Sequence, residues 1–477
     1  MTRRTKIVAT IGPASDSSAA LEAIMQAGVN VVRLNLSHGE IDDHLERLRR
    51  VRAAAEKLQL PIGVLADLPG PKVRAGQFPD GGVLLASGAV VHLRPGDGPS
   101  DAETIFVEYE TLLDDLEPGD RVILGDGAIS MRVESVGDDH ASAVVVTGAN
   151  TQGRPGVHLP SEKLTLTTPT DDDLVLAETM AEAGVEFLAV SFVRSAADVT
   201  KVRDVVGDRA QLVSKIETST ALGNLTEILA VSDAIMVARG DLGIDCPLED
   251  VPHLQKSIVR QCVEYGIPVI TATQMLESMV TSPSPTRAEV TDIANAVFDG
   301  TDALMLSGET AIGHDPCLTV ETMGRIAERA EAEASYRQWA ARLGRIQRER
   351  WESMHDRVTA AITHAASEAA VDVDATAILC CTGSGRTARA MARFRPEMEL
   401  VALSPRKRTV DSLALSWGVG PIQVADSHST DEMVAAAVDA ALEHGRIASG
   451  DSVLVLAGSP DRDATTAANV MRIVTVR

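Results

Sequence analysis

The stretch MVARGDLG, Met236–Gly243, joins an apolar run to a polar turn. It continues the run AIMVA, which predicts a buried strand, and Arg239, Gly240 and Asp241 follow directly. A barrel of parallel strands collects such strand ends at its C-terminal mouth, where barrel enzymes hold their active sites. Three other apolar runs, LVSKIET, PVITATQMLES and DALMLSGET, end in polar residues in the same way: Lys215 and Glu217, Thr273 and Gln274, and Ser307, Gly308 and Glu309.

Composition limits the classes of function. The chain has 477 residues, enough for two or three domains, and its net charge of -24 argues against binding to nucleic acid or to an anionic membrane. We see no signal peptide and no apolar run of membrane-spanning length, so we expect a soluble cytoplasmic protein. The cysteines lack CxxC spacing, which favours buried reduced thiols over disulfides or zinc. They are Cys246, Cys262, Cys317, Cys380 and Cys381.

Strand and helix patterns alternate along most of the chain. TKIVATIG is the first expected strand, and Ser17 is placed to cap a helix that ends at Gly28. VNVVRLNLSHG is the second strand, a helix runs from Asp42 to Leu60, and the third strand ends at Asp67. Five more strand and helix units begin near residue 170, and one of their helices is expected to run to Ser232, so the count is eight.

Two segments depart from this alternation. From about residue 77 to 166, short alternating runs are separated by glycine, proline and aspartate turns, which predicts an all-β insertion. A charged stretch, QWAARLGRIQRERWES at residues 338–353, is expected to be helical. Residues 355–477 alternate again and predict an open α/β domain covered on both faces.

Seven motifs, in chain order, resemble the pyruvate kinase family over nearly the whole length: RLNLSHG, DLPGPKVR, SKIET, MVARGDLG, ATQMLESM, PTRAEVTDIANAVFDG and LMLSGET. The resemblance implies a (β/α)8 TIM barrel (residues 1–70 and 167–340), an inserted small β-barrel lid domain (71–166) and a C-terminal open α/β regulatory domain (355–477). It further implies a homotetramer that transfers the phosphoryl group of phosphoenolpyruvate to ADP. The products are ATP and pyruvate, in the last step of glycolysis.

The carboxylates at two adjacent strand ends are suited to a divalent ion. Glu217 and Asp241 could hold an ion that keeps several waters, although from the residues alone they could equally form a solvated rim. The resemblance assigns both to Mg2+ or Mn2+. Lys215 lies in a mainly apolar run and needs an anionic partner, which is either Glu217 or a substrate.

The same resemblance implies roles in phosphoryl transfer, where catalysis is mostly positioning and neutralisation of charge. It places Lys215 beside the transferring group, Arg33 on the phosphate, and Thr273 in a water network that protonates the enolate. Without the resemblance, Arg33 could instead form a salt bridge at the barrel rim, and Thr273 could form a hydrogen bond within a turn. The backbone amides of Gly240 and Asp241 open a helical turn and would favour the substrate carboxylate.

Residues near the nucleotide and the monovalent cation are also implied by the resemblance. His38, Arg74 and Asn35 match positions near the nucleotide phosphates, although a histidine after a strand is often only a packing residue. The family's potassium site matches Asn35, Ser37, Asp67 and Leu68.

The chain departs from the family pattern at that cation site. Many members carry glutamate where this chain has Lys72. A lysine ammonium is a fixed monovalent cation, so we expect Lys72, paired with Asp67, to replace K+ and make it dispensable. The alternative is a solvated surface lysine. A family Glu-Lys-Asp segment is replaced by residues 170–173, Thr-Asp-Asp-Asp, which puts the lid's contribution to nucleotide binding in doubt.

In the C-terminal segment, CTGSGRTAR forms a possible phosphate cradle between a strand and a helix. It matches the family's effector loop, and the alternative is a purely structural turn. Gly383 stands where some fructose 1,6-bisphosphate-regulated members carry lysine, and the later loop AGSPDRDATTAAN lacks their tryptophan-bearing segment. A sugar or nucleotide monophosphate is therefore the expected allosteric effector. The candidate residues are Thr382, Ser384, Gly385, Arg386 and Thr387.

Two rival functions stay open. Another barrel enzyme acting on phosphoenolpyruvate or a keto acid, such as an aldolase or mutase, could share the metal-binding glutamate and aspartate. Only a kinase, however, would convert ADP to ATP. A non-catalytic metabolite sensor on this fold would be expected to lose Lys215, Glu217 or Asp241, and all three are present.

Overall fold

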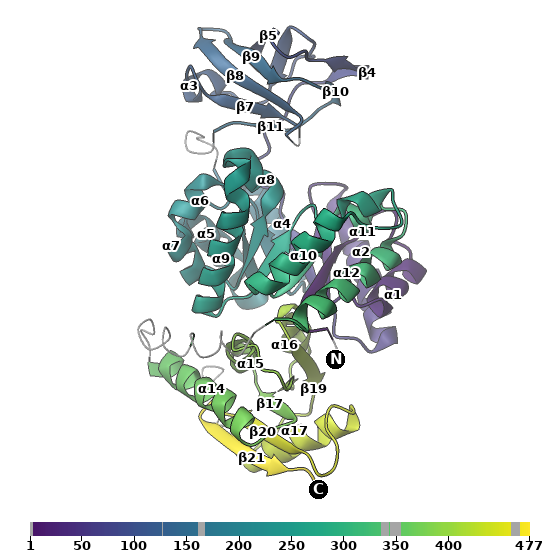
Figure 1. Ribbon diagram of the computed structural model, residues 1–477. Coiled ribbons are helices and arrows are strands. Elements are labelled where there is room, and N and C mark those ends of the chain that lie inside the picture. Colours follow the sequence, from purple (N-terminus) through teal and green to yellow (C-terminus); the bar gives the residue numbers. More distant parts are fainter. Residues whose placement is uncertain (1–2, 126, 161–166, 335–342, 344–353, 459–467) are drawn as a thin grey trace.

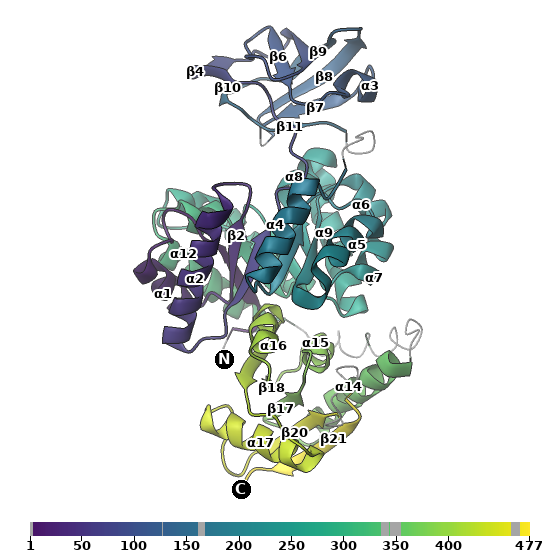
Figure 2. The same cartoon turned by 180° about the vertical axis from the view of Figure 1, so that it is seen from behind.

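The computed structural model describes residues 3–125, 127–160, 167–334, 343, 354–458 and 468–477. Figure 1 shows three parts in a row: a β-rich part at the top, a barrel in the middle and a C-terminal sheet with its helices at the bottom. Figure 2 shows the same order from behind. The helix expected at residues 338–353 lies outside the described residues except for Leu343, as does most of the loop AGSPDRDATTAAN.

Eight parallel strands close into the barrel, in the order β1-β16-β15-β14-β13-β12-β3-β2. This confirms the count of eight strand and helix units. The strands are β1 (Lys6–Thr10), β2 (Val31–Asn35), β3 (Gly63–Asp67), β12 (Phe187–Val190), β13 (Gln211–Ile216), β14 (Ala234–Ala238), β15 (Val269–Ala272) and β16 (Ala303–Leu306).

Helices surround this barrel. Ser17 caps the first of them as expected, because its hydroxyl accepts the amide of Ala20 at 3.2 Å. The single helix expected up to Ser232 is wrong: it is divided at Asn224, whose side chain instead donates to the carbonyl of Arg194. The helices are α1 (Ser18–Gln26), α2 (Ile41–Leu58), α4 (Asp171–Glu182), α5 (Ala196–Val206), α6 (Ser219–Gly223), α7 (Leu225–Val231), α8 (Arg239–Asp245), α9 (Val251–Tyr265), α10 (Arg287–Asp299), α11 (Gly308–Ala311) and α12 (Pro316–Glu331).

The barrel interior is a packed core that turns polar at the mouth. Alternate residues of a strand point the same way, so Val213, Lys215 and Glu217 share the inner side of β13 and its continuation. The lower layers are apolar, and the short helix η4 (Leu413–Leu415) from the C-terminal part packs against them from below. The polar ends of the strands are therefore held by a rigid floor.

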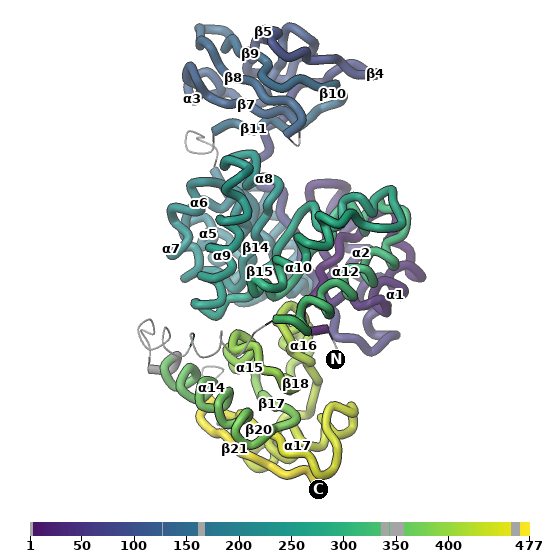
Figure 3. The backbone as a smooth tube through the Cα atoms, viewed as in Figure 1, coloured from purple at the N-terminus to yellow at the C-terminus, as the bar shows by residue number. Residues whose placement is uncertain are grey.

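The inserted part lies beyond the C-terminal ends of the barrel strands. Figure 3 shows this β-rich part beyond one end of the barrel. In the sequence it falls between β3 and α4. One mixed sheet has the order β11-β7-β8-β9-β5-β6, and β4 pairs with β10 in a separate ribbon, which gives a nearly barrel-like lid. The expected all-β insertion also contains one short helix, α3. Its elements are β4 (Phe78–Leu84), β5 (Val90–Pro95), β6 (Thr104–Val107), α3 (Leu112–Asp115), β7 (Arg121–Leu124), β8 (Ile129–Val136), β9 (Ala141–Thr147), β10 (Asn150–Gly153) and β11 (Val157–His158).

The C-terminal part is an open α/β sheet in the order β19-β18-β17-β20-β21, in which only β21 is antiparallel. Apolar clusters on both faces confirm a sheet covered on both sides. No helix among the described residues is long and apolar enough to cross a membrane. The elements are α14 (Met354–Asp372), β17 (Ala377–Cys381), α15 (Arg386–Ala392), β18 (Glu399–Ser404), α16 (Lys407–Ser412), β19 (Val419–Gln423), α17 (Thr430–Glu443), β20 (Ser452–Ala457) and β21 (Val470–Thr475).

The cysteines agree with the expectation of unpaired thiols. All five are free, and four of them are buried. Burial raises the pKa of the Cys381 thiol to about 12, so this group stays protonated near neutral pH.

Candidate active site

Asp67, at the end of β3, joins two cations at the barrel mouth. Nε and Nη2 of Arg33 each lie 2.7 Å from its Oδ2, and Nζ of Lys215 lies 3.3 Å from its Oδ1. Asp67 is only 1% exposed. Burial on its own would raise the pKa of this carboxyl, but the charges of Lys215 and Arg33 outweigh burial and lower it. Asp67 is therefore an ionised carboxylate that fixes both cations.

Lys215 has three acceptors for its three N–H groups. Besides Asp67, it donates to the hydroxyl of Ser191 at 2.7 Å and lies 2.9 Å from Oε1 of Glu217. Burial would lower the pKa of Lys215, but the charges of Asp67 and Glu217 raise it well above its usual value. The ammonium therefore stays charged at every physiological pH. Glu217, with which it forms an ion pair, is one of the two anionic partners considered from the sequence.

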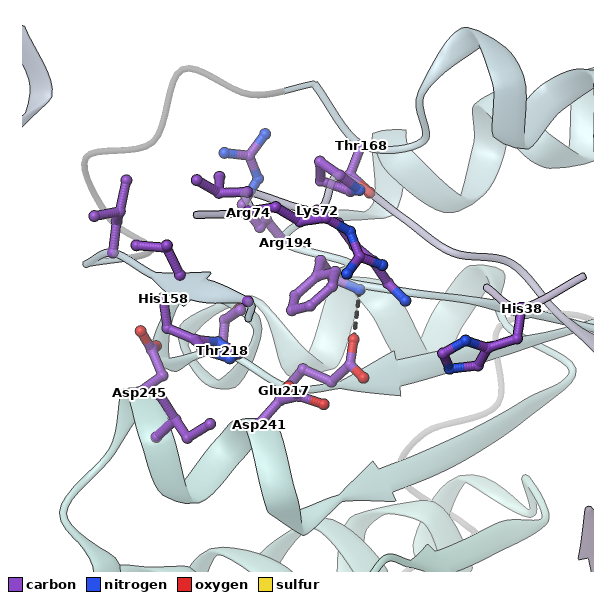
Figure 4. Close-up of a pocket in the computed structure, with 17 residues that line it drawn as sticks. His38, Lys72, Arg74, His158, Thr168, Arg194, Glu217, Thr218, Asp241 and Asp245 are labelled. Atoms are coloured by element: carbon purple, nitrogen blue, oxygen red, sulfur yellow. Dashed lines mark hydrogen bonds between the residues drawn. The ribbon is translucent and has the colours of Figure 1, made fainter. Parts of the chain in front are cut away.

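Glu217 carries an oxygen suited to a metal ion. Its Oε2 accepts the backbone amide of Phe192 at 2.6 Å, and its buried Oε1 lies 2.9 Å from Nζ of Lys215. Burial raises the pKa of this carboxyl to about 7, and the charge of Asp241 acts in the same direction. Figure 4 shows the two carboxylates next to each other on the cavity wall. Two neighbouring carboxylates on the wall of a cavity fit a divalent ion.

Such an ion would have few protein ligands. The described residues contain no group of three or more His, Cys, Asp or Glu side chains arranged to hold a metal. Two carboxylates leave most coordination positions to water and substrate oxygens, which is the usual way in which Mg2+ binds at phosphate-transfer sites.

Thr273 lies in an unusual turn directly after β15. Its φ is +69°, a value that β-branched residues rarely adopt, and Gln274 follows at +53°. The hydroxyl of Thr273 donates to the carbonyl of Ala272 at 2.7 Å and accepts the amide of Gly240 at 2.8 Å. The Gly240 amide is therefore already used inside the protein. The amide of Asp241, in the first turn of α8, has no acceptor within the helix.

Arg239 holds this turn in place. Its guanidinium donates to the carbonyls of Ala272 and Thr273 at 3.1 and 2.6 Å and pairs with Asp292 at 2.7 Å. The sequence alone places Arg239 at a strand end but predicts no role for it. Its position after an apolar strand was a signal, but its long-range partner Asp292 could not be inferred from spacing.

A cavity of about 310 Å³ opens between the barrel mouth and the lid. Its wall combines the two carboxylates with a ring of basic side chains (Figure 4). The cavity adjoins Lys215 through Glu217, because Glu217 lines the cavity and also forms an ion pair with Lys215. The basic residues on the wall are His38, Lys72, Arg74, His158 and Arg194.

The prediction that Lys72 pairs with Asp67 is wrong. Both oxygens of Asp67 are engaged by Arg33 and Lys215, and no carboxylate in the described part of the chain lies within ion-pair distance of Lys72. Desolvation lowers the pKa of Lys72, and the charges of Arg74 and Lys215 lower it further. Lys72 therefore adds positive charge to the cavity without a close counterion there.

The other positions that match the potassium site lie together near Asp67. Asn35 is its register neighbour on β2, and the side-chain oxygen of Asn35 accepts the amide of Ser37 at 3.3 Å. The carbonyl of Leu68 accepts the hydroxyl of Ser191 at 2.7 Å. The side-chain oxygen of Asn35 and the carbonyl oxygen of Leu68 thus already have internal donors.

Two segments singled out in the sequence, residues 170–173 and the loop before α15, form local hydrogen bonds. Thr170 and Asp173 form a capping box at the start of α4, and Asp173 also accepts the amide of Gly70 at 3.0 Å. In the loop before α15 the hydroxyl of Thr382 accepts the amide of Gly385 at 2.9 Å, which closes the turn. Thr387 is buried, whereas Arg386 is exposed.

The comparisons identify the family. The model of "Pyruvate kinase, barrel domain" matches residues 2–320, and that of "Pyruvate kinase, alpha/beta domain" matches residues 360–474. The pyruvate kinase of Geobacillus stearothermophilus is 39% identical over 480 residues, which cover 99% of this chain and 80% of the relative. Those of Staphylococcus epidermidis and Bacillus licheniformis are 38% identical over 476 and 480 residues, with the same coverage. The chain belongs to the pyruvate kinase family.

Proposed function

We propose that this chain transfers the phosphoryl group of phosphoenolpyruvate to ADP, producing ATP and pyruvate in the last step of glycolysis. The observation that carries the proposal is the group of four charged side chains at the barrel mouth. Arg33, Asp67, Lys215 and Glu217 are nearly buried and each contacts the next at 2.7 to 3.3 Å. Fixed charges in a dry site are what phosphoryl transfer requires.

The two cations act on different parts of the substrate. Arg33 is oriented before substrate arrives, because Asp67 and the hydroxyl of Thr10, at 3.0 Å from its Nη1, hold the guanidinium toward the mouth. It would bind the phosphate. Lys215 would stabilise the negative charge that develops on the transferring group and on the enolate oxygen.

Glu217 and Asp241 would hold the Mg2+ or Mn2+ ion. When bound, the ion supplies Lewis-acid charge to phosphate and carboxylate oxygens. Once Glu217 is engaged in this way, Lys215 keeps Ser191 and Asp67 as anchors and has one N–H left for the substrate. Thr273 would orient the water that protonates the enolate. The amide of Asp241 would face the substrate carboxylate, and Gly240, whose own amide donates to Thr273, would line the same place.

Nucleotide binding is assigned to the basic side of the cavity. His38, Arg74 and Asn35 would contact the phosphates of ADP and ATP. Burial lowers the pKa of His38, and the charges of Lys72 and Arg74 lower it further, so His38 would serve as a neutral hydrogen-bonding group.

Potassium is proposed to be dispensable. The support is that Arg33 and Lys215 already neutralise Asp67, while Lys72 adds a covalently fixed positive charge on the wall of the same cavity. Lys72 would replace the electrostatic contribution of the ion to phosphate binding, acting on the phosphate rather than on Asp67.

Regulation and assembly complete the proposal. The barrel would span residues 1–70 and 167–340, the lid 71–166 and the regulatory domain 355–477, in a homotetramer. A phosphorylated allosteric effector, a sugar or nucleotide monophosphate, would bind the loop of Thr382, Ser384, Gly385, Arg386 and Thr387. The loop contacts α16, because the hydroxyl of Thr409 donates to the carbonyl of Gly383 at 2.9 Å, and η4 follows α16 at the barrel floor.

A coupled assay with phosphoenolpyruvate, ADP and Mg2+ tests the activity. We expect pyruvate release that requires ADP and is abolished in Asp241→Asn. Asp245→Asn is the matched control, because Asp245 lines the same cavity and accepts the amide of Ser219 at 2.6 Å. Consumption of phosphoenolpyruvate without ADP would instead indicate an aldolase or mutase, and no consumption would favour a sensor.

A further inference from the structure

A two-residue turn, Ser191–Phe192, directly follows β12 and lies between the strand ends that carry Asp67 and Lys215. Ser191 is 2% exposed. Its hydroxyl donates to the carbonyl of Leu68 at 2.7 Å and accepts Nζ of Lys215 at 2.7 Å. A hydroxyl has one hydrogen, so the bond to Leu68 fixes its orientation and aims its lone pair at Lys215.

Phe192 has a backbone conformation that aromatic residues rarely adopt, with φ at +53°. In this conformation its amide donates to Oε2 of Glu217 at 2.6 Å, the hydrogen bond drawn as a dashed line in Figure 4. The bond holds one carboxylate oxygen, while the other, Oε1, lies 2.9 Å from Nζ of Lys215. Strained backbone that persists at such a place is typical of functional sites.

The surroundings hold the turn in this form. The hydroxyl of Thr168 donates to the carbonyl of Ser191 at 3.0 Å. A Cβ atom at Gly70 would lie 2.9 Å from Cβ of Ser191 and from Cδ2 of Phe192, so only glycine allows this close packing. Contacts from both connections between barrel and lid therefore meet at the turn.

We propose that Ser191 and Phe192 are positioning residues of the active site. Ser191 fixes the ammonium of Lys215 for the transferring group, and the backbone of Phe192 fixes Glu217 for the divalent ion. The inference rests on the proposed function and adds two residues to it. One short turn thereby sets both the cationic and the anionic side of the site.

Steady-state kinetics of Ser191→Ala test the first part. We expect kcat to fall about tenfold, the effect of losing one hydrogen bond to a charged group, with KM for phosphoenolpyruvate within about twofold. Ser191→Thr, which keeps the hydroxyl, should recover most of the rate. The matched control is Ser214→Ala, because Ser214 is buried next to Lys215 in sequence but contacts Ser232, at 2.7 Å.

Equal kcat values in Ser191→Ala and the unmodified enzyme would overturn the role of Ser191, as would an equal loss in Ser214→Ala. An unmodified chain without turnover would refute the proposed function and this role together.

Binding of Mn2+ alone, measured by electron paramagnetic resonance of the free ion, tests the second part without turnover. Glycine adopts a positive φ freely and valine does not, so Phe192→Gly should keep the Kd for Mn2+ and Phe192→Val should weaken binding about tenfold or more. Both variants lose the ring, which separates backbone from packing effects. If Phe192→Val does not fold, Phe192→Ala replaces it with a smaller expected loss. The role of Phe192 would be refuted if Phe192→Gly and Phe192→Val had equal Kd values for Mn2+. If the valine variant does not fold, equal Kd values for Phe192→Gly and Phe192→Ala would refute it.

Discussion

Competition between a proton and the divalent ion at Glu217 should make metal binding depend on pH near neutrality. Burial raises the pKa of this carboxyl to about 7, and only its ionised form can bind a metal. Below pH 7 most of the carboxyl is protonated, so apparent affinity must rise as pH rises. About one tenth is ionised at pH 6 and about nine tenths at pH 8, which gives a tenfold change in Kd, or about 1.4 kcal/mol.

The assay is titration of the full chain with Mn2+ at pH 6, 7 and 8, without substrates, with free Mn2+ read by electron paramagnetic resonance. Glu217→Gln should bind more weakly and with a flat pH dependence. In Lys215→Met the midpoint should move to higher pH, because the charge of Lys215 opposes the effect of burial on Glu217. An ordinary glutamate would be almost fully ionised across this range, so a Kd that changes less than about twofold would refute the reasoning.

Three other predictions follow from single lysines. Lys215→Met should lower kcat about 100-fold or more with a small change in KM, and a raised KM with unchanged kcat would count against its role in the transition state. The unmodified enzyme should be fully active in sodium-only buffer, and Lys72→Glu should become potassium dependent; strong activation of the unmodified enzyme by K+ would contradict this. Burial, with the charge of Arg3, lowers the pKa of Lys6 from 10.5 to about 7, so the folded state favours the neutral amine and loses stability as pH falls from 10.5 towards 7. Lys6→Met should therefore raise the melting temperature more at pH 6 than at pH 10, and a difference independent of pH would exclude this effect.

The sequence predicted the barrel well because its signals are local. Apolar runs of strand length that end in polar residues identified the strands carrying Lys215, Glu217 and Asp241, and a cap at Ser17 marked the first helix. The alternation of inner and outer positions then predicted which side chains would share the mouth.

Contacts across the mouth could not be predicted in the same way. Spacing placed Lys72 in a loop after Asp67, but Asp67 instead pairs with Arg33 and Lys215 from two other strands. The sequence equally gave no reason to select Ser191, because its importance depends on the ammonium of Lys215, which another strand brings within 2.7 Å. Positive φ values at Phe192 and Thr273 likewise arise from tertiary packing and leave no local pattern.

Phosphorus-31 resonance of a mixture of phosphoenolpyruvate, ADP, Mg2+ and the enzyme tests the central claim most directly, because it follows the transferred group itself. The site at the strand ends predicts loss of the phosphoenolpyruvate signal with an equal gain in the γ-phosphate signal of ATP. With Asp241→Asn in place of the unmodified enzyme, neither signal should change. Release of inorganic phosphate in place of ATP, or an unchanged spectrum with the unmodified enzyme, would contradict it.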